Sequence, residues 1–99
     1  MKLFIDTSNS EKIRLILGGE EFVADAREKK AQMLLPFIVF TLKKKSLGFS
    51  DITEIEVVTS GASFTGIRVG VSVAQTLGYL LGIKVNGKQL PEESLDISY

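Results

Sequence analysis

Residues 60–70 have the sequence SGASFTGIRVG, a run of small residues with one phenylalanine and one arginine. The run before it predicts a strand at residues 55–59, and the almost uncharged sequence after it predicts a helix at residues 65–82. A glycine-rich turn between a strand and a helix is where many proteins hold phosphate. The same small residues would also let another segment pack closely. The stretch therefore leaves two interpretations open.

The sequence before this stretch predicts an antiparallel meander followed by another helix. Apolar runs and alternation predict strands at residues 3–5, 12–17 and 20–26. Gly18-Gly19 suits a tight hairpin, because both positions can take a positive φ. A helix is expected from about Arg27 to Lys43-Lys44-Lys45, whose charge complements the helix dipole, with Leu47-Gly48 closing it. Pro36 must either kink this helix or begin its second half.

The end of the chain adds a short strand and a hairpin signal. Residues 83–85 predict the strand, and Asn86-Gly87 predicts the hairpin turn. Residues 91–99 are expected to form a short extra element or a loose tail. The order βββαβαβ predicts an α/β domain with a mixed sheet and two apolar helices.

Composition limits the chemistry of the chain. It has 99 residues, and its 12 basic and 12 acidic residues cancel, so we expect no direct binding to nucleic acid or to an anionic membrane. The sequence contains no histidine and no cysteine. No nucleophile–base pair is evident, and we expect no enzymatic activity, cofactor or metal. The first residues reach an aspartate too early for a signal peptide, and no apolar run approaches the ~20 residues of a membrane span, so we expect a cytoplasmic protein.

Both predicted helices carry more apolar surface than one sheet can cover. Residues 33–42, MLLPFIVFTL, have no polar back. In the other helix small residues recur every four positions and share a face: Gly66, Gly70, Ala74, Gly78 and Gly82. Each internal glycine costs about 1 kcal/mol of helix stability relative to alanine, which is tolerable where another backbone approaches closely. Part of this surface is expected to lie between the two helices, and the rest is expected to bind a partner.

Two segments offer polar groups for a ligand. Asp6-Thr7-Ser8, at the end of the first strand, could place a carboxylate and two hydroxyls near a phosphate or Mg²⁺. Alternatively, these residues cap a turn through bonds to backbone amides. The turn at residues 60–63 could cradle phosphate through its amides, but it lacks the lysine of a P-loop and does not match G-x-G-x-x-G.

Three stretches, in this order, resemble the N-terminal lobe of the TsaB (YeaZ) family. They are Ile5–Ser8, Gln32–Pro36 and Ser63–Gly70, the last of which is fairly specific. The similarity runs from about Lys2 to Val85 and implies a ribonuclease H-like, actin-like ATPase (sugar kinase/Hsp70/actin) lobe with Pro36 inside a helix. It also implies a role in the synthesis of threonylcarbamoyladenosine in tRNA, as a non-catalytic partner of a TsaD-like catalytic subunit. Members of the resembled family associate through the two helices of this lobe.

The chain departs from the family pattern at three places. Ser60-Gly61-Ala62-Ser63 stands where the family typically has Gly-Pro-Gly-Ser, and Lys30 stands where it commonly has histidine. The family carries a second lobe, whereas we expect residues 1–99 to form a single lobe, with Asn86-Gly87 replacing the run into a third helix. Without a second lobe, no nucleotide cleft can form between the lobes of one chain.

The leading hypothesis is a scaffold that pairs through its helices with a TsaD-like subunit or with itself as a dimer. The expected partner interface comprises Leu34, Leu35, Ile38, Phe64, Thr65, Arg68, Gly70, Val71, Ala74 and Gly78. The alternative hypothesis is a vestigial actin-like nucleotide-binding domain. It places phosphate on Asp6, Thr7, Ser8, Gly61 and Ser63. Under the leading hypothesis, the small residues of SGASFTGIRVG permit close packing at a protein interface.

Overall fold

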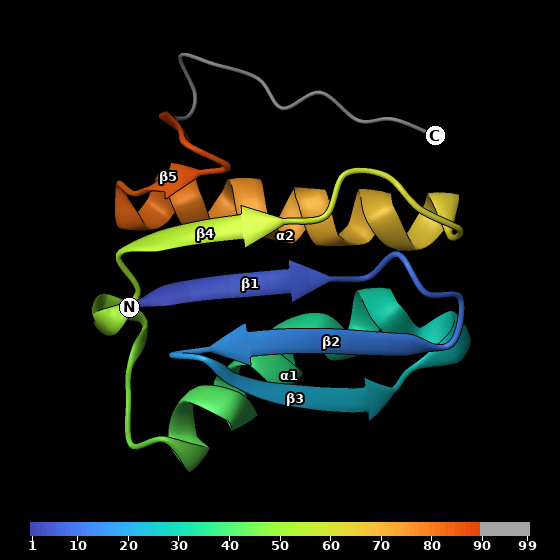
Figure 1. Cartoon of the computed structure of the whole chain (residues 1–99), viewed down its shortest axis with the longest axis horizontal. Helices are drawn as coiled ribbons and strands as arrows, with labels where there is room; N and C mark the ends of the chain where they lie inside the picture. Colours follow the sequence, from blue (N-terminus) through green and yellow to red (C-terminus); the bar gives the residue numbers. More distant parts are fainter. Residues whose placement is uncertain (90–99) are drawn as a thin grey trace.

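Six strands form one mixed sheet in the computed structural model, which describes residues 1–89 (Figure 1). The order across the sheet is β3-β2-β1-β4-β5-β6. The strands are β1 (Lys2–Asp6), β2 (Lys12–Leu17), β3 (Glu20–Asp25), β4 (Glu54–Val57), β5 (Lys84–Val85) and β6 (Lys88–Gln89). β1 runs antiparallel to β2 and parallel to β4, so it joins the meander to the parallel part of the sheet. The predicted α/β fold with a mixed sheet is confirmed, and β6 is a strand that the predicted order lacked.

Two helices cover one face of this sheet. In Figure 1, α1 (Lys30–Lys44) lies behind β2 and β3, and α2 (Phe64–Leu81) lies behind β4. Two short 3-10 turns, η1 (Arg27–Lys29) and η2 (Phe49–Asp51), precede α1 and β4. Alternate strand residues point toward the helices, and the following are fully enclosed: Leu3, Ile5, Ile13, Leu15, Leu17 and Val85. The period of two along each strand therefore decides which side chains form the core.

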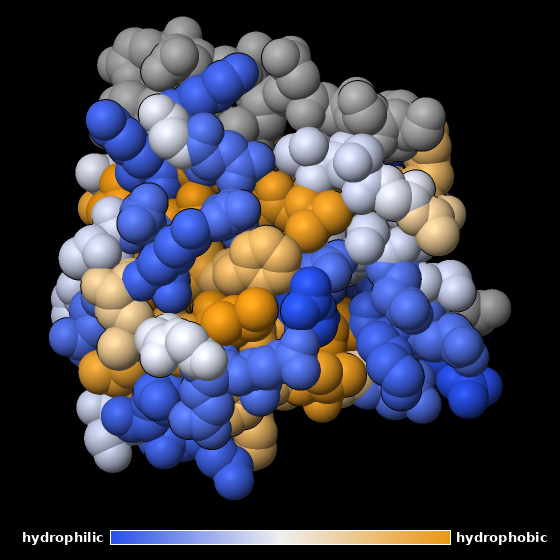
Figure 2. Space-filling view, viewed as in Figure 1, coloured by the Kyte–Doolittle hydropathy of each residue, from blue (hydrophilic) through white to orange (hydrophobic). Residues whose placement is uncertain are grey.

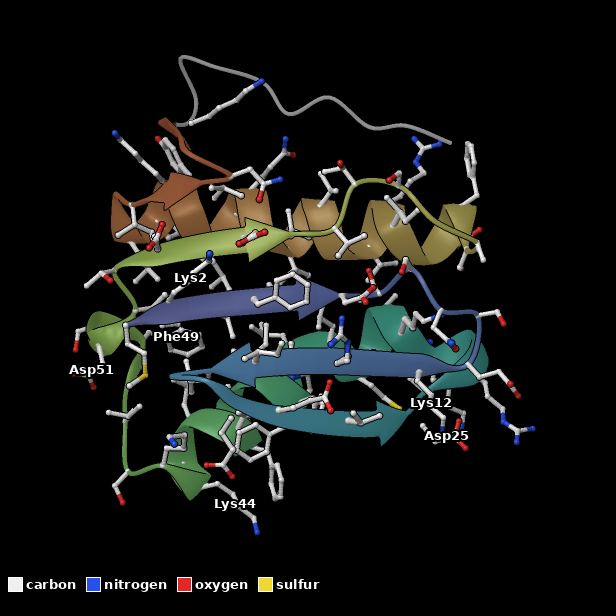
Figure 3. The ribbon with its side chains drawn as sticks, in the orientation of Figure 1. Lys2, Lys12, Asp25, Lys44, Phe49 and Asp51 are labelled. Carbon is white, nitrogen blue, oxygen red and sulfur yellow. The ribbon has the colours of Figure 1, made fainter. Side chains whose placement is uncertain are left out.

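No helix of residues 1–89 covers the opposite face of the sheet, which mixes charged and apolar side chains (Figure 2). Figure 3 shows Lys2 on this face, where its ammonium pairs with Glu56 of the neighbouring strand. Arg14 pairs there with Asp6 at 3.3 Å and with Glu21 at 2.9 Å. Because such pairs at the surface contribute only about 0–1 kcal/mol each, the stability of the fold comes mainly from the helix-covered face.

Both predicted hairpins are present. Gly18 (φ 60°) and Gly19 (φ 84°) join β2 to β3, and Asn86 (φ 50°) and Gly87 (φ 76°) join β5 to β6. Positive φ at both central residues is the requirement of a type I′ turn. The side-chain amide of Asn86 also bonds both backbone groups of Val57, at 2.8 and 3.0 Å. These bonds fix the second hairpin against the end of β4.

The ends of α1 lie close to the predicted positions. The α-helix begins at Lys30, after the 3-10 turn η1, and Pro36 lies inside it, as the resemblance implied. Lys43-Lys44 occupies the last turn, as predicted, and Ser46 takes the left-handed conformation (φ 58°) that ends the helix. The helix therefore closes just before the predicted pair Leu47-Gly48.

Two further expectations concern the ends of the chain and its apolar segments. The element or tail expected at residues 91–99 lies outside the described residues. Within residues 1–89, neither helix is both long enough and apolar enough to cross a bilayer.

Candidate functional site

The glycine face of α2 packs against the turn that follows β1. Thr7 in this turn is fully buried, and its hydroxyl donates a hydrogen bond of 2.5 Å to the carbonyl oxygen of Gly66. A Cβ at Gly66 would collide with the carbonyl oxygen of Thr7, and a Cβ at Gly70 would collide with the Thr7 hydroxyl. The small residues therefore permit the close approach that the sequence predicted, but the approaching backbone is the chain's own.

The residues of the predicted partner interface divide into a buried set and an exposed set in this fold. Six of the ten residues lie in the interior: Leu34, Ile38, Gly70, Val71, Ala74 and Gly78. They are enclosed because they occupy the helix faces turned toward the sheet, and a partner cannot reach them in this fold. Leu35, Phe64, Thr65 and Arg68 are exposed, and their part in an interface stays a prediction.

The five residues of the alternative phosphate site are close together, and they mostly bond one another. The Asp6 carboxylate accepts hydrogen bonds from the amide of Ser8 at 2.9 Å and from its hydroxyl at 2.6 Å. The Ser63 amide donates to the Ser8 carbonyl at 2.8 Å, and the Ser63 hydroxyl caps α2 by accepting from Gly66 at 3.1 Å. A Cβ at Gly61 would lie 2.5 Å from the Cβ of Ser8, so the two loops touch. This is the turn-capping arrangement that the sequence offered as an alternative to phosphate binding.

The charge of Asp6 is stabilised where it lies. Burial raises the pKa of Asp6, but the hydrogen bonds from Ser8 and the nearby Arg14 guanidinium outweigh burial and hold this pKa below its ordinary value. Asp6 is therefore an ionised acceptor whose oxygens are already engaged. An anionic carboxylate in this position repels a phosphate unless a cation lies between them.

Lys30 was not among the site residues predicted from the sequence. It is only 5% exposed, and its burial lowers its pKa, an effect that the charge of Asp6 partly opposes. Its side chain lines a hollow of about 310 Å³ between the amino-terminal ends of α1 and α2. The one available signal in the sequence was a lysine at a position where the resembled family commonly has histidine.

The outer sides of the two helices carry apolar side chains that the sheet does not cover. Both helices start at the same end of the sheet and run the same way (Figure 1), and they pack against each other. On α1, Leu35 and Val39 share a face, and on α2, Val69, Val73 and Leu80 share another. Leu35 is 45% exposed and Leu80 is 70% exposed, while the three valines are half-buried. We call these five residues the helix-pair surface.

A comparison with protein families shows to which family the chain is related. A family described as "TsaD: tRNA N6-adenosine threonylcarbamoyltransferase" matches residues 24–87, from the end of β3 to the turn after β5. The chain belongs to the TsaD family. The TsaD-family match contains both helices and therefore the whole helix-pair surface.

Individual relatives refine this assignment. An uncharacterized protein of Mycobacterium tuberculosis is 34% identical over 73 residues, which are 74% of this chain and 34% of that protein. The tRNA threonylcarbamoyladenosine biosynthesis protein TsaB of Bacillus subtilis is 27% identical over 88 residues, or 85% of this chain and 38% of TsaB. The solved structure of YeaZ from Pseudomonas aeruginosa superimposes with a TM-score of 0.73 and 26% identity, over 85% of this chain and 41% of YeaZ.

The predicted resemblance to TsaB (YeaZ) is confirmed. Within the TsaD family, the chain is a TsaB/YeaZ-like partial domain with the fold of a single actin-like lobe. It spans between a third and about two fifths of the length of these relatives.

Proposed function

We propose that the chain is a non-catalytic, TsaB-like scaffold in the formation of threonylcarbamoyladenosine on tRNA. In this proposal the helix-pair surface binds a TsaD-like catalytic subunit or a second copy of the chain. The observation that carries the proposal is the exposure of Leu35 and Leu80 on adjacent helices of a TsaB/YeaZ-like lobe. The same proposal places the chain in the cytoplasm.

The energetics favour covering this surface. Fully burying one leucine side chain is worth about 1.5–3 kcal/mol, so covering two half-exposed leucines would contribute a comparable amount in total. The half-buried valines between them would add packing contacts without a polar group that must be desolvated. An apolar centre of this kind with a polar edge is typical of a protein interface.

Arg68 offers a polar contact on another side of α2, about 100° or more around the helix axis from Val69, Val73 and Leu80. Its guanidinium lies 6.0 Å from the centre of the Phe64 ring, one turn earlier on α2, and both residues are exposed. The ring restricts the guanidinium, which lowers the entropy lost when a partner carboxylate pairs with it. We propose that Arg68 makes such a pair.

A catalytic role competes with this proposal, because the matching family is described as a transferase. The absence of histidine and cysteine from the sequence supports a scaffold. The engagement of Asp6 with Ser8 and Arg14 supports it as well, since it leaves this carboxylate poorly suited to proton transfer. An influence on catalysis would then come from binding the competent state of the partner more tightly than its other states.

The test measures association of matched variants. Leu35→Glu and Leu80→Glu should each weaken self-association, or binding to the TsaD-like subunit of the same cell, about tenfold or more, because each places a charge in an apolar contact. Val23→Glu is the control, since Val23 is 50% exposed on the opposite face of the sheet and pairs in register with Arg14. Light scattering gives the self-association, and calorimetry gives binding to the subunit.

Three results would count against the proposal. The first is a monomer of about 10.8 kDa that also fails to bind the TsaD-like subunit. The second is equal weakening by Val23→Glu. The third is tRNA modification by the reconstituted system that is unchanged when the chain is omitted or carries Arg68→Ala. Clear affinity of the isolated chain for ATP or ADP would instead favour the vestigial nucleotide-binding domain.

A further inference from the structure

A hollow of about 310 Å³ lies where three segments of the chain meet. Ser10 lines it from the loop after β1, Arg27 and Lys30 line it from η1 and the start of α1, and Ser63 and Thr65 line it from the start of α2. Its size is at the lower end of ligand pockets, which suits a small ligand better than a nucleotide.

Lys30 is a mostly buried side chain whose ammonium keeps some contact with solvent. It is 5% exposed, yet no hydrogen bond or ion pair joins it to any residue that the structure describes. Its Cδ would lie 3.2 Å from a Cβ placed at Gly66, so the side chain runs across the first turn of α2 toward the hollow. The partial burial of this side chain lowers the pKa of Lys30, and an anion in the hollow would favour the charged form.

The surroundings of Lys30 also favour negative charge. The positive end of the α2 dipole, capped by Ser63, adjoins the hollow. Arg27, whose guanidinium pairs with Asp25 at 3.4 Å, also lines the hollow, and the hydroxyls of Ser10 and Thr65 are possible donors. Among the side chains that the structure describes, none that lines the hollow is acidic.

The negative charge of Asp6 raises the pKa of Lys30 and so partly opposes the effect of burial. Asp6 is not within ion-pair distance of the ammonium, and its oxygens bond Ser8 and Arg14. Asp6 therefore stabilises the charge of Lys30 without neutralising it.

We propose that this hollow binds a small oxyanion, namely inorganic phosphate or a phosphomonoester, through Lys30 and Arg27. The site shares Ser63 with the alternative nucleotide site but differs from it, because neither Asp6 nor Gly61 lines the hollow and the binding groups are cationic. The proposal is independent of the scaffold function, since it requires no partner.

The test is a titration of the full chain with inorganic phosphate at constant ionic strength, followed by calorimetry and by amide NMR. Saturable binding should shift the amides of Ser63 and Thr65. Lys30→Met should weaken phosphate binding at least tenfold, which is about 1.4 kcal/mol, and Lys30→Arg should retain most of it. Arg27→Gln should weaken it about threefold, because Arg27 is exposed. A parallel titration with methyl phosphate shows whether the hollow binds inorganic phosphate, a phosphomonoester or both. Binding of either probe supports the proposal.

Two controls keep the result interpretable. Lys43→Met removes an exposed lysine from the other end of α1 and should leave phosphate binding unchanged. Lys30→Met should also raise the melting temperature in phosphate-free buffer, because it replaces a partly desolvated charge by an apolar side chain of similar length. If Lys30→Met fails to fold, the surface variant Arg27→Gln decides.

The proposal is overturned if neither probe saturates below about 10 mM. It is also overturned if Lys30→Met and Arg27→Gln bind phosphate as tightly as the unchanged chain. Equal weakening by Lys43→Met would show a diffuse effect of charge and would overturn it too.

Discussion

Replacing Gly70 with alanine tests whether α2 is held against β1 by the absence of a side chain. The added Cβ would overlap the hydroxyl of Thr7, which is fully buried and bonds the Gly66 carbonyl at 2.5 Å. Either α2 must move away from the turn or Thr7 must rotate and lose its bond. Overpacking of this kind costs about 1–3 kcal/mol. A buried hydroxyl left without a partner, the other outcome, costs a similar amount of about 1–3 kcal/mol.

The opposing effect is helix propensity. Alanine is favoured over glycine inside a helix by about 1 kcal/mol. The net expectation for Gly70→Ala is therefore a loss of about 0–2 kcal/mol in the free energy of unfolding, from a total of about 5–15 kcal/mol for a typical domain. Urea unfolding followed by circular dichroism measures this loss.

A double-mutant cycle assigns the loss to the contact. Thr7→Ala removes the hydroxyl, so Gly70→Ala should cost less in that background, with a coupling of about 0.5–3 kcal/mol. Ser72→Ala, an exposed position on the same helix, should stabilise slightly through propensity alone. If Gly70→Ala stabilises the chain as Ser72→Ala does, the close approach of α2 to Thr7 is refuted.

Two further predictions concern Asp6 and Pro36. Because the pKa of Asp6 is lowered in the folded state, its contribution is present above the unfolded pKa of about 3.9 and is lost as pH falls through the lower folded value. Asp6→Asn should thus lower the free energy of unfolding by about 1 kcal/mol at pH 7 and by progressively less below pH 4. Urea unfolding at several pH values measures this loss. An equal effect of the exposed control Asp25→Asn would contradict the prediction. Pro36→Ala should stabilise the chain by about 1–3 kcal/mol, because it restores an amide donor to the exposed side of α1. An unchanged or lowered melting temperature of Pro36→Ala would show that the proline helps to shape the helix.

Local chemistry made most of the fold predictable. The alternation in β2 predicted its bounds correctly, and Gly18-Gly19 and Asn86-Gly87 predicted their hairpins because few other residues tolerate positive φ. β6 was missing from the predicted order, since two residues are too few to show a period. The predicted end of α1 at the lysines lies close to the observed end, but Ser46 rather than the pair Leu47-Gly48 takes the left-handed conformation that closes the helix.

The candidate site was less predictable, because it depends on contacts between distant segments. The four-residue spacing of small residues on α2 correctly indicated a close approach, but spacing along one helix does not say which backbone approaches. Leu34 and Leu35 are neighbours in sequence, yet one is fully buried and the other is 45% exposed. The environment of Lys30 arises from three segments that no local pattern connects.

In our proposal the two faces of α2 have separate roles, which bears on the two interpretations of SGASFTGIRVG. The glycine face lies against Thr7 and belongs to the fold, whereas Val69, Val73 and Leu80 lie toward the outer side of the helix pair. A change at Gly70 should lower stability and leave the partner affinity of the folded fraction intact. A change at Leu80, which is 70% exposed, should do the reverse, because removing it opens no cavity in the core. If instead both changes lowered stability and affinity together, the helix-pair surface would be part of the same packing unit as the glycine face, and association would be inseparable from folding.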